Sequence, residues 1–279
     1  MKELFQHKLT NSFALWFNHT LMDKGEAYQS VSGELYPVSD DRIDDSYSVY
    51  ASSFKEWVMD SSFGNVVTGI KDGDDNVYGR GDGIVFDFMN GRVLSPTALT
   101  SPVTPLPETY NKKEINVYNV NDDEDDLVVD RSFEFGVSAT GAIAPYDLVV
   151  PAAFISVNGM ENEPLAFGGE QMTKTTITAT ILTDDPYQLD GVLSIFADSK
   201  NEIFAGIPMS GNPVDENGDL KGGLDYTYTG VVAGIPPKYF YVEDVTTSKL
   251  KQKTKKKVAD ELYVGFIDFD VTTNRFRFS

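Results

Sequence analysis

The sequence predicts a mixed α/β (α+β) fold that is rich in β-strands. Three features indicate this class: an amphipathic helical segment near the N-terminus, a series of β-branched and aromatic runs after it, and a strand that leads directly into a second helix. With 279 residues, 41% of them hydrophobic and 12% aromatic, the chain can bury a substantial core. We therefore expect an N-terminal helix, a strand-rich middle with a long arm, and a C-terminal α/β part.

The first element expected is an amphipathic helix over residues 10–24. Thr10 or Asn11 is a suitable cap for its start, and Gly25 is a suitable residue for its end. Its apolar face either packs in the core of this chain or is buried against a neighbouring subunit. The large apolar residues that recur at helical spacing are Leu9, Phe13, Trp16, Phe17 and Leu21.

Two strand-rich segments follow the helix. Residues 47–58 are rich in Tyr, Val, Phe and Trp, and residues 84–94 hold two apolar runs on either side of Asn90 and Gly91. Asn-Gly between apolar runs is the favoured two-residue hairpin turn, because both positions need positive φ. We therefore predict a hairpin over 84–94 with a two-residue turn, and it completes a first region, residues 1–94.

The composition changes over residues 95–130. Four prolines are followed by an acidic run, and long segments of this kind are usually functional loops or disordered. We expect an extended loop or arm that contains one short strand at 115–120. The prolines are Pro96, Pro102, Pro105 and Pro107, and the acidic run is Asp122, Asp123, Glu124, Asp125 and Asp126.

The C-terminal region, residues 131–279, is either a separate domain or continuous with the first region. Its sharpest unit is a β-branched strand at 175–182 that leads into a helix at 187–198. Pro186 suits a first helical turn, and the two aspartates before it complement the positive end of the helix dipole. The other predicted strands are 133–137, 148–157 and 262–271, and residues 210–224 are rich in Gly and Asn.

The sequence offers few groups for chemistry. It has no cysteine, which excludes disulfides, thiolate nucleophiles and cysteine-bound metals. The two histidines, His7 and His19, are separated by twelve positions and are poor candidates for a shared metal site. No motif pairs a nucleophile with a histidine base. We therefore expect a protein that is not an enzyme, with no catalytic residue, no cofactor and no metal.

Three loops resemble functional motifs but depart from their patterns. Residues 72–76 resemble the start of a calcium loop, yet position six is Val77 instead of glycine and position twelve is Gly83 instead of glutamate. Residues 215–219 also lack the closing acid. The glycines of 79–83 lead into a strand, whereas a phosphate-binding loop leads into a helix. We expect turns at all three places.

The charge balance argues against a generic phosphate-binding surface. The formal net charge is -20, and such surfaces work through clustered Lys and Arg. An acidic balance is either a solubility device or the lining of a channel through which nucleic acid passes without binding. No membrane partner is expected, because the N-terminus lacks a secretion signal and no apolar run is long enough to span a bilayer.

One basic segment stands out at residues 249–257. It is either a solvated loop, a contact with an acidic face of a partner or another copy, or a phosphate contact. Charge segregation of this kind favours head-to-tail association into rings or stacks. Its lysines are Lys249, Lys251, Lys253, Lys255, Lys256 and Lys257.

Several stretches resemble an uncharacterised family of virion structural proteins from tailed bacteriophages. They span most of the chain. They are Leu15-Trp16-Phe17, Lys24-Gly25-Glu26-Ala27-Tyr28, Asp87-Phe88-Met89-Asn90-Gly91-Arg92-Val93, Gly141-Ala142-Ile143-Ala144-Pro145-Tyr146-Asp147, and Tyr187-Gln188-Leu189-Asp190-Gly191 with Leu193-Ser194-Ile195-Phe196.

The strand–Asp-Asp–helix unit at 175–198 and the last strand are similar to those of neck and tail-terminator proteins. The resemblance implies a homo-oligomeric ring that joins head and tail around a DNA conduit, with other virion proteins as partners and DNA passing without specific binding. It also implies a virion location after synthesis in the host cytoplasm. The expected assembly contacts are the helix at 10–24 with Phe13, Trp16 and Phe17, the arm with its acidic run, and the lysine segment.

Two alternatives stay open. Within the virion, the chain is a baseplate, hub or decoration protein. In another class, it is a β-rich carbohydrate-binding or hydrolytic module, in which Trp16 and Trp57 with some of the fourteen tyrosines form a platform for sugar rings.

Overall fold

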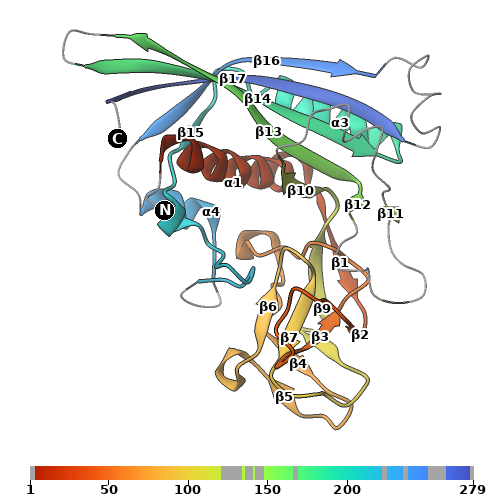
Figure 1. Cartoon of the computed structure of the whole chain (residues 1–279). Coiled ribbons are helices and arrows are strands. Elements are labelled where there is room, and N and C mark those ends of the chain that lie inside the picture. Colours follow the sequence, from red (N-terminus) through yellow and green to blue (C-terminus); the bar gives the residue numbers. More distant parts are fainter. Residues whose placement is uncertain are drawn as a thin grey trace.

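The computed structural model describes residues 4–120, 134–135, 141, 148–165, 169–221, 225–234, 238–250 and 262–276. The fold is a strand-rich α+β arrangement, as the sequence predicts. Figure 1 shows a curled six-stranded sheet over helix α1 (Phe5–Gly25), with several small sheets below the helix.

Helix α1 confirms the predicted N-terminal helix but begins earlier. Leu4 precedes the first helical turn, so the expected cap at Thr10 or Asn11 is wrong. Asn11 is instead buried within the helix, where its side-chain amide donates to the carbonyl of Ile207 at 3.2 Å. Glu26, with φ of 48°, follows the last turn in the left-handed region.

The part below α1 consists of three small sheets. Strands β1 and β9 form a pair, β2-β3-β7-β6 form a four-stranded sheet, and β5-β4-β8 form a three-stranded one. Of the segment expected to be strand at 47–58, only β3 is a regular strand. The bounds are β1 Tyr28–Ser32, β2 Tyr36–Val38, β3 Ser48–Ala51, β4 Gly69–Lys71, β5 Val77–Tyr78, β6 Val85–Asp87, β7 Arg92–Ser95, β8 Thr104–Leu106 and β9 Thr109–Lys113.

The predicted hairpin is present, but its two-residue turn is wrong. Strands β6 and β7 pair as far as Asp87 and Arg92, which leaves a four-residue loop between them. Phe88 leaves the ladder because its side chain is buried and its carbonyl accepts from the Trp57 N–H at 2.9 Å. Within the loop only Gly91 has positive φ, and a side chain there would meet the Phe54 carbonyl.

The first part of the predicted arm is packed structure, which corrects that expectation. Residues 104–106 and 109–113 are strands β8 and β9, and Tyr110 is fully buried. Pro105 is compatible with β8 because this strand lies at the edge of its sheet, where a missing N–H donor is tolerated. The expected short strand is confirmed as β10 (Asn116–Asn119), while residues 121–130 lie outside the described part.

The main sheet has the strand order β10-β13-β14-β17-β16-β15. The first pair is parallel and the others are antiparallel. The predicted strands at 175–182 and 262–271 are confirmed and are longer than expected. Bounds are β13 Ala152–Pro164, β14 Glu170–Thr183, β15 Ile203–Ala205, β16 Tyr239–Lys249 and β17 Tyr263–Phe276, with β11 (Glu134–Phe135) and β12 (Val149–Val150) paired separately.

Helices α1 and α3 (Pro186–Ala197) cover the inner face of this sheet. The predicted cap of α3 is confirmed, since the Asp185 carboxylate accepts the Tyr187 N–H at 2.9 Å and Pro186 occupies the first turn. Gly265 of β17 allows α3 to approach closely, because a Cβ there would lie 2.8 Å from a Leu189 methyl carbon. A short third helix, α4 (Tyr228–Ala233), contacts α1, and its Tyr228 ring stacks on His19 of α1 at 4.4 Å between centroids.

One cluster of buried apolar residues joins α1, α3, the inner sheet face and the small sheets. It includes Phe86 and Tyr110 from below α1 as well as Phe269 from the main sheet. The division of the chain into regions 1–94, 95–130 and 131–279 stays a prediction.

Candidate functional site

The three aromatic residues expected as assembly contacts in the first helix lie in the core, which corrects that expectation. Phe13 and Phe17 are fully buried, and Trp16 is 4% exposed. Trp16 stacks on Phe204 at 5.3 Å between ring centroids, and Phe13 meets Phe269 edge-on at 5.0 Å. The apolar face of α1 therefore packs within this chain and is not available to a neighbouring subunit.

Most of the charged residues expected as contacts lie outside the described part. This applies to the acidic run, Asp122, Asp123, Glu124, Asp125 and Asp126, and to Lys251, Lys253, Lys255, Lys256 and Lys257. The remaining one, Lys249, ends β16 and forms an ion pair with Asp190 of α3. Both side chains are about half exposed, and this pair ties the sheet to the helix.

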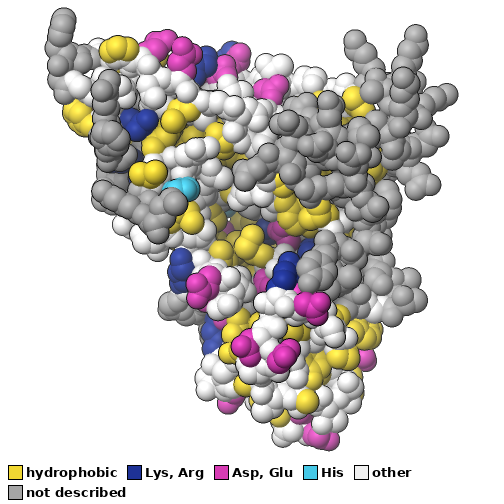
Figure 2. Space-filling model, in the orientation of Figure 1, with side chains coloured by type: hydrophobic (Ala, Val, Ile, Leu, Met, Phe, Trp, Pro, Cys, Tyr) yellow, Lys and Arg dark blue, Asp and Glu magenta, His cyan; other side chains and the backbone are white. Residues whose placement is uncertain are grey.

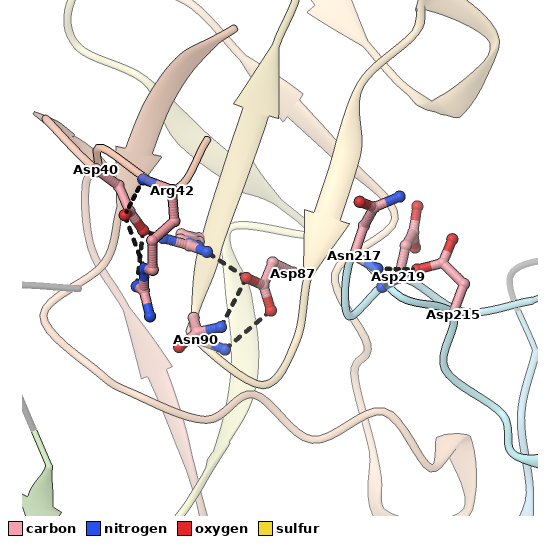
Figure 3. A network of polar contacts seen from close by, with 8 residues as sticks. Asp40, Arg42, Asp87, Asn90, Asp215, Asn217 and Asp219 are labelled. Atoms are coloured by element: carbon pink, nitrogen blue, oxygen red, sulfur yellow. Dashed lines mark hydrogen bonds and ion pairs between the residues drawn. The ribbon is translucent and has the colours of Figure 1, made fainter. Parts of the chain in front are cut away.

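A buried ionic network holds the β6–β7 hairpin (Figure 3). Arg92 lies between the carboxylates of Asp40 and Asp87, and all three side chains are almost completely buried. Asn90 donates its side-chain amide to Asp87 at 2.8 Å. Hydrogen bonds from Arg42 and then Arg92 hold the pKa of Asp40 well below its usual range. The network neutralises its own charges, and its role is structural.

A second buried ion pair connects helix α1 to the strands beneath it. The Lys113 ammonium binds the Glu56 carboxylate and donates to the Asn18 side-chain oxygen of α1 at 2.8 Å. The other Glu56 oxygen accepts the Val117 N–H at 3.0 Å. Burial raises the pKa of Glu56, and the charge of Lys113 opposes that rise.

The loops that resemble calcium sites are turns, as expected. Asp72 accepts from the backbone N–H groups of Asp74 and Asn76, so its own turn occupies the carboxylate. Asp215 accepts from the N–H of Asp219 in the same way, and Asp219 pairs with Arg80. Across the described ranges, no three side chains of His, Asp or Glu come together as a metal-binding group.

The two tryptophans do not form a sugar-binding platform. Trp16 is 4% exposed and Trp57 is 1% exposed, so neither ring presents a face to solvent. Trp57 packs edge-on against Tyr110 and donates its indole N–H to the Ser52 hydroxyl at 3.1 Å. The tryptophans therefore give no support to the carbohydrate-binding alternative, which stays a prediction.

The outer face of the six-stranded sheet carries polar residues in its middle, whereas its end at β13 is apolar and buried around Phe154 and Leu182. Threonines of β14 bind aspartates of β17 across the strands: Thr178 donates to Asp268 at 2.6 Å and Thr176 to Asp270 at 3.1 Å. Lys174 pairs with Asp270 at 3.1 Å, and the hydrogen bond between them raises the lysine pKa. Figure 2 shows acidic side chains with a few basic ones between them along the top of the molecule, where the main sheet lies.

The middle of this face keeps an excess of carboxylates. Asp244 of β16 lies opposite Asp270 in the register. Lys200 binds Asp244 at 2.8 Å, and the resulting hydrogen bond lowers the pKa of Asp244. This part of the face holds four carboxylates and two lysines. The lysines Lys174 and Lys200 pair with Glu243, Asp270 and Asp244, while Asp268 accepts a hydrogen bond from Thr178. Charge and hydroxyl groups together make this surface hydrophilic and negative.

At the β15 edge the same face becomes apolar. Ile203 of β15 lies directly opposite Tyr241 of β16, and each side chain is 51% exposed. Tyr239, two residues earlier on the same face, is also exposed. We call Ile203, Tyr239 and Tyr241 the apolar edge patch.

The β13–β14 hairpin extends beyond α1 at the upper left of Figure 1. Within the described residues, β10 pairs with β13 only as far as Ile155, and residues 158–164 are exposed. A bulge follows Val157, and the free edge carries Glu161, Glu163 and Pro164. Bulges, charges and proline blunt edge-to-edge strand pairing, so this extension is suited to side-chain contacts.

Sequence reasoning did not single out the outer face. Part of the signal was present, because Asp268 and Asp270 alternate with the apolar residues Phe269 and Val271, which is typical of a half-buried strand. The register that places Thr176 beside Asp270 comes from tertiary pairing and has no local signature.

Comparison with models of protein families finds none that matches this chain, and comparison with curated proteins finds no match either. No helix of the described residues is long and apolar enough to cross a lipid bilayer.

Proposed function

We propose that the chain is a structural protein of a tailed-bacteriophage virion, of the neck or tail-completion class. In this proposal it forms an oligomeric ring that joins head and tail around a DNA conduit. The resemblance of several sequence stretches to phage virion proteins supports the class. The strand–Asp-Asp–helix unit, present as β14 and α3, supports the narrower likeness to tail-terminator proteins.

One observation carries the proposal: the outer face of the main sheet combines a hydrophilic, negative surface with an apolar edge patch. On this surface carboxylates outnumber the lysines, and the lysines are paired with carboxylates, so the net negative charge repels DNA phosphates and lets DNA pass without binding. Exposed apolar residues rimmed by polar ones are typical of protein contacts. We assign the acidic part of the face to the conduit and the apolar edge patch to a contact between subunits.

The charged groups in the core support a structural role. Arg92 binds Asp40 and Lys113 binds Glu56 across elements that are distant in sequence, and Arg92 also binds Asp87 within its own hairpin. These ion pairs stabilise the fold, and of the five residues that form them only Asp40 lines one of the surface pockets described, where its carboxylate is already bound by Arg42 and Arg92. The proposal therefore includes a non-enzymatic role with no cofactor.

Mass measurement by light scattering and negative-stain electron microscopy of the purified chain test the ring. We expect a closed oligomer with a central opening, stable enough to image at micromolar concentration. A chain that stays monomeric over the whole accessible concentration range, and forms no ring when mixed with virion extracts that lack it, would contradict the oligomeric part of the proposal.

A further inference from the structure

A pocket lies where strands β16 and β17 separate. The two strands pair as far as Tyr241 and Thr272, and beyond this point the register stops. The space between their ends is a cavity of about 270 Å³ that the start of helix α1 closes from below. The lining includes Phe5, Lys8, Lys238, Tyr239, Tyr241 and Arg275.

Arg275 is held rigidly in this pocket. Its guanidinium lies over the Phe5 ring at 4.2 Å from the centroid. It donates from Nε to the Thr173 hydroxyl at 2.8 Å and from Nη2 to the Asn162 side-chain oxygen at 3.1 Å. Burial lowers its pKa below the ordinary value. Two of its five N–H donors are therefore occupied, and these bonds fix the orientation of the planar guanidinium before any ligand binds.

Arg275 differs from the other arginines of the described ranges. Arg42, Arg80 and Arg92 each bind a carboxylate, whereas Arg275 binds only a neutral hydroxyl and a neutral amide. In a chain with 43 acidic and 23 basic residues, a partly buried arginine with neutral partners is unusual. It keeps the capacity to bind an anion.

Lys238 adds a second cation to the pocket. Its backbone is fixed, because its carbonyl accepts the Gly206 N–H at 2.7 Å, and its side chain is exposed. No described carboxylate lies within ion-pair distance of its ammonium. Lys8 also lines the pocket, and among the described residues the lining contains neither Asp nor Glu.

We propose that this pocket binds a carboxylate-bearing segment of a second copy of the protein. The inference rests on the proposed oligomeric function and names one of its contacts. An Arg fork beside a Lys matches a carboxylate, and charge-assisted hydrogen bonds of this kind are the strong ones. The exposed tyrosines Tyr239 and Tyr241 cover the apolar parts of a peptide segment.

Two observations favour a second copy over nucleic acid. The cavity fits one or two side chains, whereas a duplex needs an extended basic surface. Tyr239 and Tyr241 also belong to the apolar edge patch, so the pocket is continuous with the proposed subunit contact. A contact between unlike surfaces of identical copies generates rings when it closes.

The test is calorimetric titration of the full chain with a synthetic peptide, Asn-Asp-Asp-Glu-Asp-Asp-Leu, which copies residues 121–127. We expect saturable binding that weakens with added salt and is absent for the same peptide with every acid replaced by its amide. Arg275→Gln and Lys238→Gln should each weaken binding about tenfold or more. Lys71→Gln, which removes one positive charge far from the pocket, should leave it unchanged.

Lys238→Gln keeps the test valid if Arg275→Gln fails to fold, because the Lys238 side chain is exposed. Peptide binding that neither pocket variant changes, or no binding at all, overturns the proposal. Inorganic phosphate and a short DNA duplex are titrated in parallel. Binding of the duplex that the variants weaken, without binding of the peptide, overturns it in favour of nucleic acid. Particle localisation decides the proposed function separately, so the two failures are distinguishable.

Discussion

Phe17 of helix α1 and Phe196 of helix α3 stack face to face, with ring centroids 4.1 Å apart and planes 9° from parallel. Both rings are fully buried, and both meet Phe269 of β17 nearly edge-on. The first helix is thus fixed to the inner face of the sheet by aromatic packing. This packing determines which surfaces remain for assembly.

Phe17→Ala should lower the free energy of unfolding by about 3–5 kcal/mol, because it opens a cavity among close-packed rings. Denaturant unfolding followed by circular dichroism measures the change. Tyr187→Ala is the control: this aromatic residue is 82% exposed, and its loss should change stability by about 0.5 kcal/mol or less. If Phe17→Ala unfolds like the wild type but fails to assemble, the helix face is an interface after all.

Arg92→Met should destabilise the fold by about 3–5 kcal/mol, because it leaves the carboxylates of Asp40 and Asp87 buried without their common partner. Arg42 binds the same Asp40 but its side chain is half exposed. Arg42→Met should therefore cost about 1 kcal/mol or less. Equal losses in the two variants, measured by thermal and denaturant unfolding, would mean that burial does not govern this network.

The Asp40 carboxyl should contribute to acid denaturation. Its pKa in the folded state is lowered, mainly by the hydrogen bond from Arg42, relative to about 3.9 in an unfolded chain. Its ionised form therefore stabilises the fold above the unfolded pKa, and this contribution is lost as pH falls towards the folded pKa. Asp40→Asn should be less stable than the wild type at pH 7, with a gap that narrows below about pH 4. A gap that is the same at neutral and acid pH would contradict this assignment.

The apolar edge patch should matter for assembly more than for folding. Replacing Ile203 and Tyr241 together by threonine places a β-branched residue with high strand propensity at both positions and should change the free energy of unfolding by about 1 kcal/mol or less. Oligomer mass should nevertheless fall. Tyr36→Thr, at an exposed tyrosine of β2 below α1, is the control and should leave the mass unchanged. An unchanged oligomer in the double variant would remove the patch from the contact.

Features with local signals were predictable from the sequence. The α3 start is an example, because Asp185 and Pro186 act within one helical turn and their effect needs no tertiary contact. The β-branched run of β14 is another, since its propensity and its burial agree. The prediction of a two-residue Asn90-Gly91 turn was wrong because Phe88 is buried and its carbonyl accepts a hydrogen bond from Trp57, which lies far away in the sequence. This contact takes Phe88 out of the strand and lengthens the loop.

Features that depend on which elements meet could not be predicted. Amphipathic spacing identifies the apolar face of α1, but the same spacing serves a core and an interface, and only the ring contacts of Phe13 and Phe17 decide between them. The arm was misjudged because Pro105 suggested a loop, whereas an edge strand also tolerates proline. The pocket around Arg275 joins residues from both ends of the chain, so no local pattern announces it.

The measurement that tests the virion assignment most directly is immunogold electron microscopy of purified phage particles with an antibody against the recombinant chain. We expect label at the head–tail junction. Label at the tail tip or over the capsid would keep the chain in the virion as a baseplate, hub or decoration protein and would contradict the neck assignment. The complete absence of label on intact and opened particles, with a positive control that labels, would contradict the virion role itself.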